Sequence, residues 1–143
     1  MTARRRWAIG SAIVILCASM AIAAILVRRH NAQRRLAARE AGYAAVVADY
    51  ANRLKPGLTR AQVEQQLRAE GKEFHHMCCM GASHNAFDTL LLIGEESAPW
   101  YCSEHYVYVG FEFFSEGTHR FSEALPSDKL VDVRLYKQLS GCM

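Results

Sequence analysis

The sequence predicts an α+β protein with an N-terminal transmembrane helix, followed by two helices packed on a small three-stranded antiparallel sheet. Three observations lead to this prediction. Residues 7–27 contain no charged side chain, a Lys-Pro-Gly break at 55–57 separates two helical patterns, and three later segments are enriched in the β-branched and aromatic residues of strands. We therefore divide the chain into a basic tail at 1–6, a spanning helix at 7–27, a basic amphipathic helix at 28–54 and a compact domain at 55–143.

The uncharged stretch at 7–27 has the length of a membrane anchor. About 20 apolar helical residues cross a hydrocarbon core, and arginines at 4–6 and 28–29 bound the stretch sharply. A cleaved secretory signal is the competing interpretation, because residues 21–23 form a small-x-small cleavage pattern. The apolar run continues past that pattern, which favours a retained anchor.

Charge is divided unevenly along the chain. Residues 1–53 contain nine arginines against two acidic residues, for a net +7, and residues 54–143 contain eight basic against twelve acidic residues, for −4, which together give +3. The basic segment suits contact with anionic head groups, so a lipid bilayer is an expected partner. An acidic domain binds nucleic acid poorly, so nucleic acid is excluded as a partner.

Residues 32–54 are predicted to form a helix with a single apolar stripe. Its members recur at spacings of seven, four, three and four: Leu36, Tyr43, Val47, Tyr50 and Leu54. One interpretation is that the stripe packs against the sheet of its own domain. The other is a dimeric coiled coil that continues from the membrane helix, which makes a homodimer through these helices an open alternative.

The next helix has clear start and stop signals. Thr59 is placed to cap the free amides, and Gln62 three residues later completes a capping box. Gly71 is placed to end the helix in a left-handed conformation. Together with the turn before the helix and its core-facing positions, this structural motif comprises Pro56, Gly57, Thr59, Gln62, Val63, Leu67 and Gly71.

Strands are predicted at 87–93, 105–114 and 130–139, which are enriched in β-branched and aromatic residues, and the last two segments also have the two-residue period of strands with one buried face. The connection at 115–128 suits a loop between antiparallel neighbours. The two later strands align their apolar faces when three pairs stand opposite each other: Phe113 and Val131, Phe111 and Val133, and Val109 and Leu135.

This register predicts one disulfide. It places Cys102 opposite Cys142, and a bond between them would close a long loop and stabilise the fold by roughly 3 to 5 kcal/mol. The alternative pairing joins Cys79 with Cys102. The four cysteines of the domain suit an oxidising compartment.

The segment around residues 75–84 carries side chains that bind metals. Imidazole and thiolate suit Zn, and thioether suits Cu(I). The spacing matches no closed metal motif, and neighbouring strand residues point to opposite faces, so we expect no metal and no cofactor. The alternative is a metal-binding or thiol-redox sensor that uses His75, His76, Cys78, Cys79 and His84.

No catalytic constellation is predicted. By residue type, Cys79 could act as a nucleophile with His84 or His105 as its base, and Glu95 and Glu96 could act as paired carboxylates. No sequence pattern places either pair in a cleft. The chain also lacks a phosphate-binding glycine loop and a nucleophile elbow. We therefore expect no enzyme. An aromatic binding surface, or else core and sheet-face packing, is expected for Trp100, Tyr101, Tyr106 and Tyr108.

The helix-start segment resembles a known family. The run Lys-Pro-Gly-Leu-Thr-Arg-Ala-Gln-Val at 55–63, followed by Leu67 and Gly71, is similar to the signature of the SmpA/OmlA (BamE-like) small bacterial envelope proteins. The resemblance implies two helices on a small antiparallel sheet, like the β-lactamase-inhibitor-protein fold, and a place in the cell envelope. The elements at 100–102 and 141–142 resemble those of bacterial single-pass membrane proteins.

These observations lead to a functional expectation. We expect a single-pass protein of the bacterial inner membrane with a periplasmic domain; the arginine balance supports the alternative of a cytoplasmic domain. The expected role is a non-catalytic protein–protein interaction or accessory scaffold module that contacts other envelope proteins.

Overall fold

The structure is a computed structural model, and it describes residues 3–78, 86–116 and 123–143, with side chains from residue 16 onward. The chain forms two compact units, Met1–Ala41 and Gly42–Met143; we call the second unit the sheet domain. The elements in chain order are α1 (Ala3–Arg53), α2 (Arg60–Ala69), β1 (His75–Cys78), β2 (Phe87–Glu95), β3 (Glu104–Phe114) and β4 (Lys129–Ser140).

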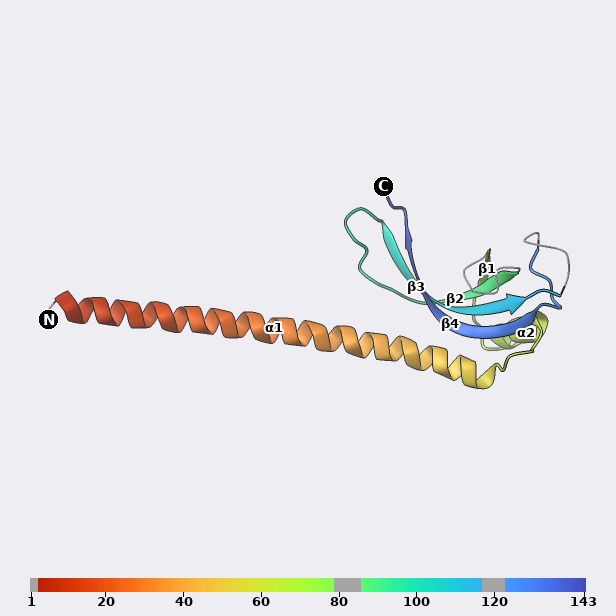
Figure 1. Cartoon of the computed structure of the whole chain (residues 1–143), viewed down its shortest axis with the longest axis horizontal. Helices are drawn as coiled ribbons and strands as arrows, with labels where there is room; N and C mark the ends of the chain where they lie inside the picture. The colour runs from red at the N-terminus through yellow and green to blue at the C-terminus, as the bar shows by residue number, and fades with distance from the viewer. Residues whose placement is uncertain (1–2, 79–85, 117–122) are drawn as a thin grey trace. The chain divides into compact units, whose positions relative to one another are not determined.

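The sheet has four antiparallel strands in the order β1-β2-β3-β4, so every strand pairs with its neighbour in sequence (Figure 1). The prediction of three strands was wrong because it missed β1. The sequence of β1, His-His-Met-Cys, has four residues and no alternation of apolar and polar side chains. Its pairing with β2, from His75 opposite Leu90 to Cys78 opposite Phe87, makes it a strand.

The predicted transmembrane anchor is also corrected. No helix in the described part of the chain is both long and apolar enough to cross a membrane. The side chains at residues 7–15 of the predicted anchor lie outside the described residues. The predicted single-pass inner-membrane location depended on this anchor and is contradicted with it.

The second helix, α2, begins and ends as its motif suggests. The backbone amide of Gln62 donates to Thr59 Oγ1 at 3.3 Å, and the amide of Thr59 donates to Gln62 Oε1 at 2.9 Å, which is a capping box. At the other end Gly71 has a φ of 67°, and the amides of Gly71 and Lys72 donate to the carbonyls of Arg68 and Leu67. This pair of bonds is a Schellman motif.

One hydrophobic core lies between the sheet and the helices. The last turns of α1 contribute Tyr50 and Leu54, and the ring of Tyr50 meets Phe111 edge-on at 5.5 Å between centroids. Val47 also packs against this core, whereas Leu36 is exposed, so only the later part of the predicted apolar stripe contacts the sheet. The remaining members are Val63, Leu67, Ala86, Leu91, Val109, Phe113, Leu130 and Val133.

The β3–β4 register agrees with the predicted one except at one end. Phe111 stands opposite Val133 and Val109 opposite Leu135, but Phe113 stands opposite Leu130 instead of Val131. A bulge between Glu112 and Phe113 causes this difference. It turns Leu130 toward the core and leaves Val131 exposed.

A buried ion pair joins α2 to the sheet. Arg60 at the start of α2 is 1% exposed and donates to Asp128 Oδ2 at 3.0 Å, while Asp128 also accepts from the amide of Leu125 at 3.0 Å. The same guanidinium donates to Thr89 Oγ1 at 2.8 Å and to the carbonyl of Phe87, both on β2. Arg60 therefore links α2, the turn before β4 and the middle of the sheet.

Removing one partner of this buried pair is expected to destabilise the fold severely. Asp128→Ala leaves the Arg60 guanidinium buried without its counter-charge, and we expect a loss of about 3 to 5 kcal/mol in the free energy of unfolding, measured by urea denaturation. Asp132→Ala, which removes one of the two carboxylate partners of the exposed Arg134, is the control and should cost under about 1 kcal/mol. Equal losses in the two variants would contradict this role of Asp128.

Candidate interaction site

A groove of about 500 Å³ crosses the face of the sheet that is turned away from the helices. Alternation along the strands explains this position: Leu91 and Val109 point into the core, so their neighbours Leu92 and Tyr108 point to the other face. We call this hollow the tyrosine groove. Its described lining consists of Glu73, Phe74, His75, Leu92, Glu95, Tyr106 and Tyr108.

A β-bulge in β2 gives the groove one of its carboxylates. Leu92 stands opposite Tyr108 and Gly94 opposite Val107, so Ile93 is an extra residue on its strand. The extra residue lets Leu92 and Glu95 share the groove face, although they are three positions apart. On the core side, a Cβ at Gly94 would lie 2.8 Å from the hydroxyl oxygen of Tyr43, so a larger residue there would have to displace the Tyr43 ring.

Aromatic rings form the floor of the groove. Tyr108 is 7% exposed, and its ring lies 5.3 Å from His75 in an edge-on arrangement and 6.0 Å from Tyr106. Leu92 beside them is 46% exposed, which is high for a large apolar side chain in the middle of a strand. The floor therefore presents the exposed side chain of Leu92 and the half-buried ring of Tyr106 to a ligand, with the ring of Tyr108 buried beneath them.

The groove is acidic at its rim, where Glu73 and Glu95 are exposed, and its described lining contains no lysine or arginine. A hydrogen bond to Glu104 raises the pKa of Tyr106, and burial, followed by the charges of Glu104 and Glu95, raises the pKa of Tyr108. Both phenols therefore stay neutral at neutral pH, and the negative charge of the site comes from its carboxylates.

A disulfide, which we call the clasp, joins the residues just before β3 to the residues just after β4, next to the groove. Cys102 and Cys142 are joined with an Sγ–Sγ distance of 2.01 Å, as the sequence register predicted. The amide of Met143 donates to the carbonyl of Tyr101 at 2.9 Å, so the C-terminus lies beside the start of β3 (Figure 1). The adjacent Trp100 is 88% exposed. The clasp fixes the strand end that carries Glu104 and Tyr106.

The residues of the alternative metal site do not converge. His75 lines the groove, whereas His76 lies on the other face and its Nε2 is 2.7 Å from Glu64 Oε1. Cys78 is disulfide-bonded and so is not a thiolate ligand, and Cys79 and His84 lie outside the described residues. Among the described side chains, no group of three or more is placed to hold a metal ion.

The formal catalytic pairs are also separated. Glu95 lines the groove, whereas Glu96 accepts from Lys137 at 3.0 Å. His105 Nδ1 is 3.8 Å from Glu96 Oε2, and the proposed nucleophile Cys79 lies outside the described residues. Glu95 and Glu96 therefore do not form a paired-carboxylate centre.

Sequence reasoning found part of the groove and missed the rest. Tyr106 and Tyr108 were expected as aromatic surface, and Trp100 and Tyr101 lie at the clasp, outside the groove lining. The lining residues that it missed are Glu73, Phe74 and Leu92. A usable signal was the run Leu-Leu-Ile-Gly-Glu at 91–95, where strict alternation fails.

Comparison of the chain with protein families, with curated proteins and with solved structures finds no match. The resemblance to the SmpA/OmlA family therefore stays a prediction from the motif at residues 55–71.

Loss of the disulfide is expected to lower stability without changing the fold. The bond joins residues 40 positions apart, and releasing a loop of that length costs about 4 kcal/mol. We expect this loss in the free energy of unfolding of Cys102→Ser/Cys142→Ser, measured by urea denaturation. Cys17→Ser removes the exposed free cysteine and should leave stability unchanged. A double variant as stable as the wild type would rule out a stabilising clasp.

Proposed function

We propose that the sheet domain is a non-catalytic protein–protein interaction module whose tyrosine groove binds an arginine-bearing segment of a partner polypeptide. The observation that carries this proposal is the composition of the groove: rings at its floor and carboxylates at its rim, with no lysine or arginine in the described lining. This combination of groups suits a guanidinium ion.

The floor supports binding through the rings. A guanidinium over a tyrosine face gains about 0.5 to 1 kcal/mol at exposed sites and more when water is excluded. The half-buried ring of Tyr106 lies 6.0 Å from the buried ring of Tyr108 at an angle of 52°, so a cation stacked on Tyr106 has a second ring close by. Leu92 adds apolar surface for the methylene stem of the same side chain.

The rim supports selection by charge. Glu73 and Glu95 belong to segments on the two sides of the groove, the residues before β1 and the end of β2. A carboxylate accepts two parallel bonds from a guanidinium, a geometry that an ammonium lacks. Arginine is therefore preferred over lysine, and the binding weakens as salt screens the exposed charges.

Peptide titration of the full chain tests this function. The probes are three nine-residue peptides that differ only at their two central positions, which are arginine, lysine or the neutral isostere citrulline. We expect binding of the arginine peptide with a Kd on the order of 100 µM, followed by tyrosine fluorescence and calorimetry. The lysine peptide should bind more weakly and the citrulline peptide not measurably.

Groove variants locate the binding. Glu95→Gln should weaken the arginine peptide about threefold, the effect of one exposed ion pair, and Tyr106→Leu should weaken it by removing a π-face. Glu123→Gln removes an exposed carboxylate that does not line the groove and serves as the matched control. Equal affinity for the arginine and citrulline peptides, or equal effects of Glu95→Gln and Glu123→Gln, would refute the proposed function.

A further inference from the structure

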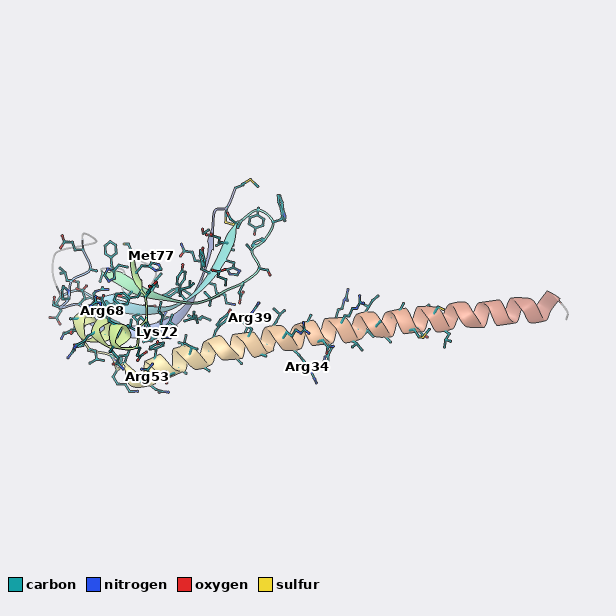
Figure 2. All side chains as sticks on the ribbon, turned by 180° about the vertical axis from the view of Figure 1, so that it is seen from behind. Arg34, Arg39, Arg53, Arg68, Lys72 and Met77 are labelled. Atoms are coloured by element: carbon teal, nitrogen blue, oxygen red, sulfur yellow. A yellow bond between two sulfur atoms is a disulfide. The ribbon has the colours of Figure 1, made fainter. Side chains whose placement is uncertain are left out.

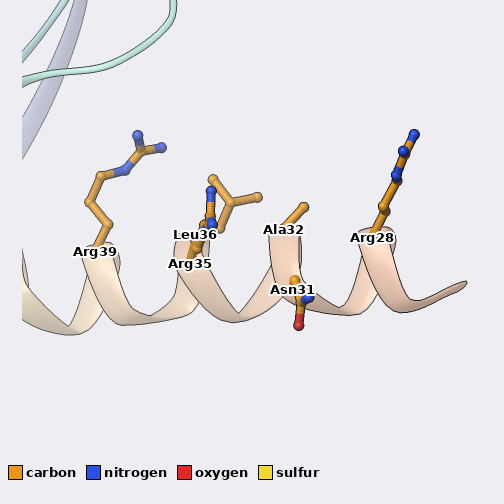
Figure 3. Close-up of a pocket in the computed structure, with 6 residues that line it drawn as sticks. All are labelled: Arg28, Asn31, Ala32, Arg35, Leu36 and Arg39. Atoms are coloured by element: carbon orange, nitrogen blue, oxygen red, sulfur yellow. The ribbon is translucent and has the colours of Figure 1, made fainter. Parts of the chain in front are cut away.

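The helix α1 carries a surface whose chemistry matches the tyrosine groove. Figure 3 shows the side chains of Arg28, Arg35 and Arg39 on one side of this helix, where they help to line a hollow. We call this surface the arginine face. It is lined by Arg28, Asn31, Ala32, Arg35, Leu36 and Arg39. Because all the lining residues belong to one helix, the hollow cannot surround a small molecule, and we treat it as a docking surface.

The spacing of these residues creates the face. Positions 28, 32, 35 and 39 are four, three and four residues apart, and such positions lie above one another on a helix. The small Ala32 between the arginines opens the hollow. Arg34 leaves the helix on the other side, opposite Arg39, as Figure 2 shows.

We propose that the arginine face of one chain docks in the tyrosine groove of a second copy. This inference rests on the proposed function of the groove and names its partner. Charge supports it, because the segment 1–53 carries +7 and the segment 54–143 carries −4. Leu36, which is 52% exposed, supplies an apolar side chain that matches the exposed Leu92 of the groove.

The arginine face is longer than the part of the sheet that it would cross. Eleven helical steps from Arg28 to Arg39 cover about 16 Å, and three strands, β1 to β3, cover about 10 Å across the sheet. The proposed contact is therefore a short stretch of the arginine face lying in the groove, anchored by residues three and four apart.

Sedimentation of the full chain tests the proposal. At low salt we expect the mass to rise with concentration from that of one chain, 16.1 kDa, to twice that value, and to fall back at high salt. Arg28→Glu/Arg35→Glu should stay monomeric. Arg34→Glu, which changes a charge outside the arginine face, should associate like the wild type; circular dichroism checks that all variants keep their helix.

A mixing experiment identifies the two surfaces. Arg28→Glu/Arg35→Glu disables the arginine face, and Glu73→Lys/Glu95→Lys disables the groove. Each variant alone should stay monomeric, but a mixture should form a heterodimer, because each chain retains the surface that the other needs and the reversed charges also match. Association within single chains would give no such complex.

Three results would overturn the proposal. They are a wild type that stays monomeric at every concentration, a mixture that forms no heterodimer, and an Arg28→Glu/Arg35→Glu variant that associates like the wild type. The last result would assign association to the apolar part of α1. The peptide titration judges the groove separately: if the arginine peptide binds while the chain stays monomeric, the groove function stands and only the partner is wrong.

Discussion

The buried ion pair between Arg60 and Asp128 is the constraint on which the sheet domain depends. A guanidinium taken out of water is costly, and burial lowers the pKa of Arg60, so the folded state holds the charge only while every donor has an acceptor. The acceptors come from β2 and from the turn before β4. Once they are in place, α2 has one position under the sheet, and the stacking of Arg60 over Phe113 at 4.0 Å ties it to β3 as well.

With the helices fixed on one face, two local irregularities shape the other face into a site. The bulge at Ile93 brings Glu95 beside Leu92, and the disulfide at Cys102 holds the end of β3 that bears Tyr106. A regular strand would turn Glu95 toward the core, next to Tyr43. Deviations from ideal sheet geometry thus give the site its shape, while the regular part of the sheet provides its rigidity.

Sequence reasoning recovered the elements that are specified locally. The capping box at Thr59 and the β3–β4 register at Phe111 and Val109 follow from patterns within a few residues, and the register in turn gave the disulfide. It missed β1, which is a strand only because β2 pairs with it, and it gave no role to Arg60, whose partner Asp128 lies 68 residues away. The groove was found only in part for the same reason: its lining comes from three strands whose alignment includes a bulge.

Charge alone gives the groove little selectivity among basic side chains, so in the proposed function the remaining selectivity has to come from its aromatic rings. An acidic surface attracts any basic segment, and at physiological salt this attraction fades within about 8 Å. In the proposed function, contacts with Tyr106 and Tyr108 would act only at close range and would depend on the orientation of a planar cation, so they would separate arginine from lysine after the charges had brought the partner near. On that proposal the carboxylates at the rim would set the rate of encounter, and the neutral phenols at the floor would decide which side chain stays bound.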